Sequence, residues 1–403
     1  MYSMGLLRAL GVTGRSGRPG CRRRSTVRAL LPPPVQNRQR HTAGQQVPQP
    51  RSYRSAAPPA CIAAVAGGGS TAAEVDEPHV PVLMEQVLSS FRPLQLGVYL
   101  DGTLGAAGHA CAVMAEHPEL RTVVGIDQDP MALGIAEEKL RAAAAGRSDA
   151  LELKLVKSNF RDMRAVVKSH GLADRGVDAI LLDLGMSSMQ VDSAERGFSF
   201  MNDGPLDMRM DPDGEITAAD IVNGWSEQQL GRIFRDYGEE KYWRQFARRI
   251  CAARETTQLA STLQLADALG PPIFKRGKGK KGGKTTHPAT RVFQALRIAV
   301  NDELRVVEQV IPEAVRCLAP GGRLGIITFH SLEDRIVKKA FLAAAGRPPS
   351  ELTGAEARLR LELGPEEPAQ VRLVTRKPMG PSEGEIDANP RSRSAKLRVV
   401  EKL

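Results

Sequence analysis

The sequence lacks several features that would place a chain of 403 residues in a familiar class. No run of 18 or more apolar residues occurs in it, so neither a membrane-spanning helix nor a membrane partner is expected. The five cysteines lie far apart and form no Cys-x-x-Cys pair, which predicts a reducing compartment and no zinc or other metal site. The Gly-x-Gly-x-x-Gly spacing is missing from the first loop, which argues against a nicotinamide-dependent oxidoreductase.

Residues 1–73 contain no lysine, aspartate or glutamate but eleven arginines. Such a segment, rich also in Ala, Pro, Gly and Ser, cannot pack a core and is typical of a disordered transit peptide. Its short apolar runs, broken by arginine, argue against a signal peptide, and a disordered tail that is not cleaved stays open as an alternative. The arginine density fits a mitochondrial leader, whereas the length of about 70 residues fits a plastid leader. We favour the chloroplast and keep the mitochondrion as the other organelle.

The net charge of +10 comes from this leader alone. Without it the chain holds 45 basic and 46 acidic residues, so a nucleic acid would have to bind local basic patches. The candidate patches are Lys241, Arg244 and Arg248 on one helix face, the Gly-rich loop 275–284, and Arg391, Arg393, Lys396 and Arg398. Each of them could equally be a solvated surface.

From His79 onward the pattern is globular, and apolar strands alternate with helices. Strands are predicted at 98–101, 123–127, 151–156, 177–183 and 322–329, and helices at 108–117, 130–145 and about 300–317. Continuous apolar strands between helices are typical of a parallel sheet covered on both faces. The sequence therefore predicts a doubly wound α/β fold that binds its ligand at the carboxyl ends of the strands.

More than 100 residues separate the fourth predicted strand from the fifth. Residues 217–288 within this stretch are dense in helix formers and predict an inserted helical subdomain. The expected organisation is a leader over 1–73, a sheet domain formed by 74–216 and 289–403, and the helical insertion over 217–288.

Small and acidic residues follow the predicted strands. The loop from Asp101 to His109 could cradle a nucleotide-like ligand or be a plain tight turn. Asp127 ends the second strand, where a carboxylate can accept hydrogen bonds from a ribose. Asp129, which precedes a proline, is expected to cap the next helix and to leave Asp127 free for a ligand. Asp183 ends the fourth strand, and an Asx turn that orders the loop is the alternative to a ligand contact.

Two further segments combine polar and apolar side chains near strand ends. Residues 195–211 mix Arg, Asp, Phe and Met without a helical or strand period, which predicts a cover for a substrate or cofactor. After the fifth strand, Ser331 with Asp334 three residues later is expected to cap a helix. His330 before it could contact a substrate or be structural.

Together these segments resemble the MraW/RsmH family, whose members methylate N4 of a cytidine in small-subunit ribosomal RNA. The resemblance runs from His79 to the C-terminus. The longest matching segments are DLGMSSMQVDSAERGFSFMNDGPLDMRMD at 183–211, YGEEKY at 237–242, HPATRVFQALRIAVNDEL at 287–304, GGRLGIITFHSLEDRIVK at 321–338 and NPRSRSAKLR at 389–398. With the leader, the resemblance suggests a plant or algal version acting on plastid ribosomes, or a mitochondrial equivalent.

The resemblance implies a class I, Rossmann-like methyltransferase domain and S-adenosyl-L-methionine as cofactor. Because a base edge must be reached, we expect the helical insertion 217–288 to clamp the RNA. The cofactor contacts that it implies fall on Ala107, Gly108, His109, Asp127, Phe160, Asp183 and Gln190. The family usually has Gly-x-Gly-Gly-His in the first loop, so Ala107 would add a methyl group where the backbone nears the ligand. Met189 replaces the proline of the family's Ser-Ser-Pro, a smaller change.

Methylation of a cytosine amine needs an acceptor that draws its proton, because the lone pair of the nitrogen is delocalised into the ring. The Pro-Pro-aromatic motif of many amino-methyltransferases is absent; Asp183 takes its place as the catalytic candidate, with His330 as the second. The expected partner is small-subunit rRNA or the assembling subunit, with an unpaired or flipped target base. A non-catalytic ribosome-assembly factor is the alternative. The oligomeric state stays open, a homodimer included.

Overall fold

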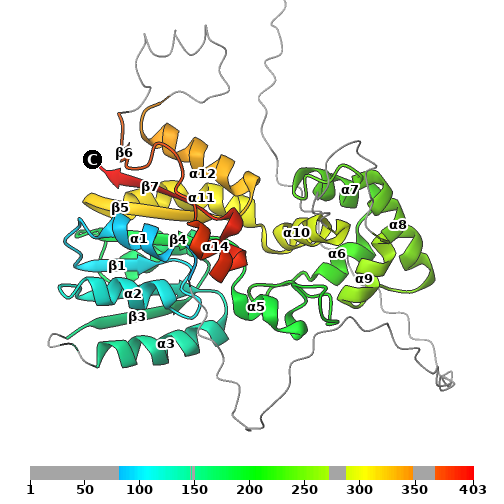
Figure 1. Cartoon of the computed structure of the whole chain (residues 1–403), viewed down its shortest axis with the longest axis horizontal. Coiled ribbons are helices and arrows are strands. Elements are labelled where there is room, and N and C mark those ends of the chain that lie inside the picture. The colour runs from blue at the N-terminus through cyan, green and yellow to red at the C-terminus, as the bar shows by residue number, and fades with distance from the viewer. Residues whose placement is uncertain (1–80, 146, 148–149, 272–286, 348–367) are drawn as a thin grey trace, which may run out of the picture. The chain divides into compact units, whose positions relative to one another are not determined.

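The computed structural model describes residues 81–145, 147, 150–271, 287–347 and 368–403 (Figure 1). The chain divides into two units, Met1–Ala73 and Glu74–Leu403, and all of the described residues belong to the second. The leader predicted over 1–73 and the basic loop 275–284 lie outside the described residues. Within the described ranges, no helix is long and apolar enough to cross a membrane, and no group of three or more His, Cys, Asp or Glu residues is placed to hold a metal ion.

Seven strands of the described chain form one sheet. They are β1 (Val98–Asp101), β2 (Thr122–Asp127), β3 (Glu152–Lys157), β4 (Val177–Asp183), β5 (Leu318–Thr328), β6 (Val371–Leu373) and β7 (Lys396–Lys402). In the order β3-β2-β1-β4-β5-β7-β6, the first five strands are parallel and β7 runs antiparallel to both of its neighbours. The five predicted strands are confirmed, and β6 and β7 add an edge that was not predicted.

Alternate residues of the strands pack into two apolar clusters, one on each face of the sheet. One cluster, which contains Val98 and Leu100, packs against α4 (Met163–Ser169), α11 (Glu303–Cys317) and α12 (Ser331–Ala344). The other, which contains Tyr99 and Val123, packs against α1 (Met84–Phe91), α2 (Gly108–Glu116) and α3 (Pro130–Ala144). This confirms the doubly wound α/β fold. The strand order reverses between β1 and β4, the place where such sheets bind ligands.

A second group of helices packs around its own apolar cluster, apart from the sheet (Figure 1). This helical unit comprises α6 (Ala218–Gly224), α7 (Glu227–Asp236), α8 (Trp243–Thr256), α9 (Thr262–Leu269) and α10 (Pro288–Asn301). The buried members of its cluster run from Phe198 to Leu296, beyond the predicted limits of 217–288 on both sides. The loop 195–211 and the apolar face of α10 supply the additional side chains. The chain returns to the sheet at Asp302, a left-handed residue with φ of 51°.

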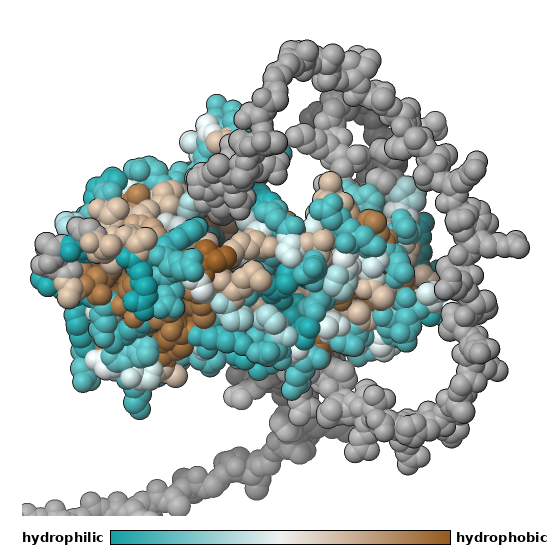
Figure 2. All heavy atoms as spheres, turned by 90° about the horizontal axis from the view of Figure 1, so that it is seen from below, coloured by the Kyte–Doolittle hydropathy of each residue, from teal (hydrophilic) through white to brown (hydrophobic). Residues whose placement is uncertain are grey.

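The surface of the described chain is largely hydrophilic on the face shown in Figure 2, and hydrophobic residues gather mainly over the sheet half. Large hydrophobic side chains that reach solvent include Met131 and Met201, which are 65% and 80% exposed. The helical unit has buried its apolar residues against one another, as amphipathic helices do. Its outer face therefore carries mostly polar and charged side chains, with Met201 and Leu263 as exposed apolar exceptions.

The predicted cap of α12 is wrong by one residue. His330, not Ser331, is the N-cap, and Glu333 three residues later accepts the backbone N–H of His330. Ser331 instead donates its hydroxyl to Glu239, between α7 and α8, at 2.6 Å. Asp334 accepts from Arg398 of β7 at 2.7 Å. The short-range pattern failed because partners far away in the sequence bind both side chains.

Candidate functional site

A pocket opens at the carboxyl ends of β1, β2 and β4. Its walls are the loops that follow these strands, η1 (Phe160–Asp162) and α5 (Ser188–Asp192). Six of the predicted site residues line it: Gly108, His109, Asp127, Phe160, Asp183 and Gln190. The described residues that line it do not include Ala107 or His330. The topology thus brings together most of the residues that were predicted from separate segments.

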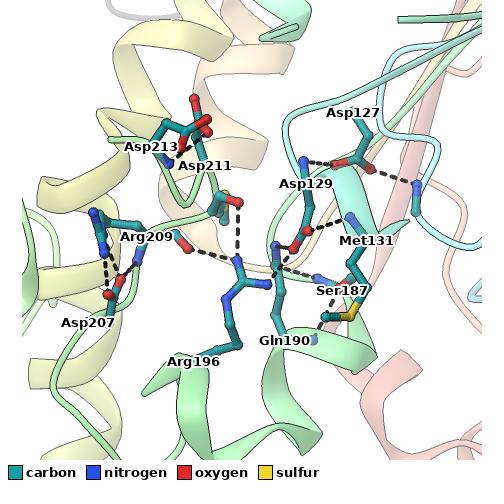
Figure 3. A network of polar contacts seen from close by, with 12 residues as sticks. Asp127, Asp129, Met131, Ser187, Gln190, Arg196, Asp207, Arg209, Asp211 and Asp213 are labelled. Atoms are coloured by element: carbon teal, nitrogen blue, oxygen red, sulfur yellow. Dashed lines mark hydrogen bonds and ion pairs between the residues drawn. The ribbon is translucent and has the colours of Figure 1, made fainter. Parts of the chain in front are cut away.

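Asp127 joins two loops at the edge of this pocket (Figure 3). Its Oδ2 accepts the N–H of Gly105 at 2.8 Å, and its Oδ1 accepts the N–H of Asp129 at 2.9 Å. Burial raises the pKa of the Asp127 carboxyl, and these backbone hydrogen bonds oppose the rise. Each carboxylate oxygen can accept a further hydrogen bond. The prediction that Asp129 caps α3 is confirmed, since its Oδ1 accepts the N–H of Met131 at 3.1 Å.

The first loop turns through two left-handed residues. Gly105 has φ of 51° and Ala107 has φ of 60°. The Ala107 side chain is fully buried in the apolar cluster around α1 to α3, and its N–H donates to the carbonyl of Leu104 at 2.8 Å. The structure therefore packs this methyl group in the apolar core rather than in the lining of the pocket. Gly108 is the crowded position: a Cβ atom there would lie 2.4 Å from Cγ of Pro81.

Asp183 ends β4 with an unsatisfied carboxyl group. Its backbone N–H donates to Oγ1 of Thr103 at 2.7 Å, and its Oδ2 lies 3.9 Å from Nδ1 of His109. Its Oδ1 is buried and has no hydrogen-bond partner in the described part of the chain. Burial, followed by repulsion from Asp101 and Glu333, raises the pKa of this carboxyl well above its usual range. A buried acceptor that its own loop leaves unpaired points to a ligand rather than to a loop-ordering turn.

Asp101 is linked to Asp183 through Thr103, and this role was not predicted. Its Oδ1 accepts the N–H of Thr103 and its Oδ2 accepts the hydroxyl of Tyr99, both at 3.1 Å. Thr103 in turn accepts the N–H of Asp183. Burial raises the pKa of Asp101 to about 6. The signal was present in the sequence, since Asp101 ends a strand just as Asp127 and Asp183 do.

Gln190 and the loop 195–211 close the pocket on the side of the helical unit. Gln190 is buried, forms a capping box with Ser187 at the start of α5, and has its Nε2 3.5 Å from Oδ2 of Asp129. Met210, near the end of the loop, lines the pocket. This placement is consistent with the predicted cover. The loop also joins this wall of the pocket to α6 and α10, through the bonds of Asp207 with Ala218 and of Met210 with Asn301.

His330 takes part in a buried polar network next to the pocket. Its Nε2 lies 3.0 Å from Oε1 of Glu333, and Glu333 also accepts the N–H of Phe329 at 2.8 Å. Arg297 of α10 and Glu303 of α11 form a buried bidentate pair at 2.8 and 2.9 Å. Phe329, and not His330, lines the pocket. The network holds the start of α12 in place.

The basic patches differ in how many of their side chains form ion pairs with acidic residues. In the C-terminal group, Lys396 and Arg398 pair with Asp334, and Arg391 pairs with Asp192. Arg391 also lines the pocket. On the helical unit, Lys241, Arg244 and Arg248 are exposed and lie on α8 or just before it. Arg248 lies 3.9 Å from Glu227, and the guanidinium of Arg244 lies 4.3 Å from the ring centre of Trp243. The helical unit therefore carries the more accessible positive charge.

Comparison with known proteins gives a consistent result over all of the described residues. The model of the MraW methylase family matches residues 76–403. "Ribosomal RNA small subunit methyltransferase H" of Protochlamydia amoebophila is 49% identical over 326 residues, covering 81% of this chain and 98% of that protein. The protein of that name from Heliobacterium mobile is 44% identical over 329 residues, covering 81% and 99%. The pocket, the sheet and the helical unit all fall inside the family match, and residues 1–75 fall outside it.

Proposed function

The chain belongs to the MraW methylase family, and on this premise we propose that it methylates N4 of a cytidine in the small-subunit rRNA of an organellar ribosome, with S-adenosylmethionine as methyl donor. Relatives named as small-subunit rRNA methyltransferases support the substrate. The arginine-rich, acid-free segment 1–73 supports the organelle. The observation that carries the reaction is the pocket with its unsatisfied Asp183 carboxyl.

The pocket residues fit this cofactor. The Oδ1 atom of Asp183 lacks a partner among the described residues and suits a donor or a cationic group of a ligand. Asp127 has capacity to accept hydrogen bonds from ribose hydroxyls, and Phe160 offers a ring for stacking beside it. Gly108, which has no side chain, lets the loop lie against Pro81. S-adenosylmethionine supplies an electrophilic methyl group when it is bound.

Asp183 is the residue that we assign to the proton of the cytosine amine. Its raised pKa favours the protonated form in the free pocket, whereas a positive charge nearby favours the ionised form. The ionised carboxylate accepts an N–H of the amine and so helps to localise the nitrogen lone pair. Holding the base in line contributes further, up to about 7–11 kcal/mol in ideal cases. His330, engaged with Glu333, is assigned to holding the start of α12 and not to the chemistry.

The helical unit is the part that we assign to RNA. Its outer face carries exposed basic residues on and beside α8, which can bind phosphates. The family's reaction requires a base that is unpaired or flipped out of a helix. The pocket is lined by Met210 of the loop 195–211, and this loop is also part of the helical unit. A nucleotide held by that unit would therefore be presented to the pocket.

Nucleoside mass spectrometry of organellar small-subunit rRNA, with and without this protein, tests the proposal. We expect N4-methylcytidine to disappear in its absence and to return with the wild-type protein but not with Asp183→Asn. Glu137→Gln, which alters an exposed carboxyl on α3 paired with Arg141 of the same helix, is the matched control and should restore the modification. Unchanged N4-methylcytidine without the protein would refute the reaction. rRNA binding without methyl transfer would favour an assembly factor.

The organelle is tested separately. Residues 1–73 fused to a fluorescent protein should direct it to the plastid, and a fusion in which their eleven arginines are replaced by glutamine should stay in the cytosol. Delivery to mitochondria would replace the plastid by the other organelle. A cytosolic wild-type fusion would contradict the organellar part of the proposal.

A further inference from the structure

The guanidinium of Arg196 connects segments that are distant in the sequence (Figure 3). Arg196 is the last residue of η2 (Ala194–Arg196), and its side chain is 19% exposed. Its Nη1 lies 2.5 Å from Oδ2 of Asp129. Its Nη2 donates to the carbonyl oxygens of Arg209 at 3.0 Å and Met210 at 3.2 Å. One planar group thereby ties the start of α3 to the far end of the loop 195–211.

Asp129 carries this connection into the pocket. Its backbone N–H donates to Oδ1 of Asp127 at 2.9 Å, and its Oδ2 lies 3.5 Å from Nε2 of Gln190. Asp127, Gln190 and Met210 all line the pocket. Arg196 binds the carbonyl of Met210 directly. It also binds the carboxylate of Asp129, which in turn contacts Asp127 and Gln190. The position of this guanidinium therefore affects three pocket residues at once.

The same loop is anchored in the helical unit. Leu206 and Met208 are buried in the apolar cluster of that unit. The carbonyl of Asp207 accepts the N–H of Ala218, at the start of α6, at 2.8 Å. Asn301, at the end of α10, donates to the carbonyl of Met208 and accepts the N–H of Met210, both at 2.8 Å. A movement of α6 or α10 is thus transmitted to Met210 and to the carbonyls that Arg196 holds.

We propose that Arg196 is a positioning residue that couples the pocket to the helical unit, so that each binds its ligand more tightly when the other is occupied. The inference rests on the proposed function, in which the pocket takes S-adenosylmethionine and the helical unit takes rRNA. Arginine suits the role because its rigid fork donates to a carboxylate and to two carbonyl groups at once, whereas lysine presents a compact single ammonium. Such coupling is reciprocal and is typically about 5- to 150-fold.

Calorimetry on the full-length protein measures the coupling. The Kd of S-adenosylhomocysteine is determined with and without small ribosomal subunits from cells that lack the protein. We expect the subunits to lower this Kd by about fivefold or more for the wild type, and the ratio to fall close to 1 in Arg196→Lys. Arg141→Lys is the matched control and should keep the wild-type ratio, because the Arg141 side chain is 69% exposed and bonds to Glu137 of its own helix, α3.

The outcomes separate the inference from the proposed function. A wild-type ratio near 1, or an Arg196→Lys variant with the wild-type ratio, would overturn the coupling and leave the methyltransferase proposal intact. A wild-type protein that binds no S-adenosylhomocysteine would overturn both.

Hydrogen exchange on the wild-type protein gives an answer even if Arg196→Lys does not fold. S-adenosylhomocysteine should slow exchange at the amides of Leu206, Ala218 and Ala219. The Leu206 amide bonds to the carbonyl of Ala260, just before α9, and the amides of Ala218 and Ala219 in α6 bond to carbonyls of the loop 195–211. Protection confined to the loops after β1, β2 and β4 would overturn the coupling.

Discussion

Replacing Asp101 by asparagine should stabilise the protein increasingly as the pH rises. Asp101 is 2% exposed and accepts hydrogen bonds from the Tyr99 hydroxyl and the Thr103 amide. Burial raises its pKa from 3.8 to about 6, with those hydrogen bonds opposing the rise and repulsion from Asp127 adding to it. Asparagine keeps the shape, can still accept from Thr103, and can donate to the Tyr99 oxygen. The substitution therefore removes the ionisation and few of the contacts.

The sign and size of the effect follow from this shift. An acid whose pKa is raised on folding contributes stability below its unfolded pKa, and the contribution is lost as the pH rises through the folded pKa. For Asp101 this window runs from 3.8 to about 6. A rise of the pKa from 3.8 to about 6 corresponds to about 3 kcal/mol. Relative to the wild type, the free energy of unfolding of Asp101→Asn should therefore increase by about 2–3 kcal/mol between about pH 4 and pH 8.

Urea unfolding of both proteins across this pH range measures the difference. Asp213→Asn is a suitable control, because Lys157 lowers the pKa of the exposed Asp213 carboxyl and its contribution is lost as the pH falls. The two variants should thus show opposite dependences on pH. A difference for Asp101→Asn that stays constant, or that shrinks as the pH rises, would show that the buried carboxyl ionises without penalty and would refute the reasoning.

Three further substitutions test the pocket and the core. Ala107→Gly should change the free energy of unfolding by less than about 1 kcal/mol, because relief of the left-handed backbone offsets the lost methyl burial; a loss above about 2 kcal/mol in urea unfolding would contradict this. Gly108→Ala should weaken S-adenosylhomocysteine binding about tenfold in calorimetry, since Pro81 must move; unchanged affinity would argue against the crowding. Glu303→Gln should lower the free energy of unfolding by about 3–5 kcal/mol by leaving the buried Arg297 guanidinium without a counter-charge; a loss below about 1 kcal/mol would exclude a tight pair.

The central strands could be predicted because each is buried on both faces and so forms a continuous apolar run. Strands β6 and β7 could not, since β7 carries Arg398 and Glu401, which are buried only because they pair with Asp334 and Arg323. A run such as KLRVVEK reads as half polar until those partners are known. A strand whose charged residues are buried by ion pairs with distant residues leaves no periodic signal in its own sequence.

The boundary of the helical unit shows the same limit. Helix formers between 217 and 288 predicted its helices, but α10 and the loop 195–211 join its core through contacts over long sequence separations. Asn301 bonds to Met208, 93 residues away, and Arg196 bonds to Asp129, 67 residues away. Composition locates helices; it does not say which cluster each apolar face will join. The domain limits therefore had to come from the packing.

The candidate site was predictable to the extent that acids at strand ends gather at one edge of a parallel sheet. What the pattern could not separate is a carboxyl that orders the chain from one that awaits a ligand. Asp129 is of the first kind: the N–H of Met131, the guanidinium of Arg196 and the amide of Gln190 surround it. Asp183 is of the second kind, with a buried Oδ1 that no described residue binds.

This difference has an energetic meaning. Burial and the neighbouring carboxyl of Asp101 both raise the pKa of Asp183, so in the free protein its ionised form is disfavoured and its protonated form lacks a partner for one oxygen. Folding alone gives no reason for such an arrangement, since buried polar groups without partners reduce stability. A donor or a cation in the pocket would satisfy the same atom and lower the pKa. A ligand-binding carboxyl therefore differs from a helix cap in one respect: it lowers the stability of the free protein until a ligand pairs with it.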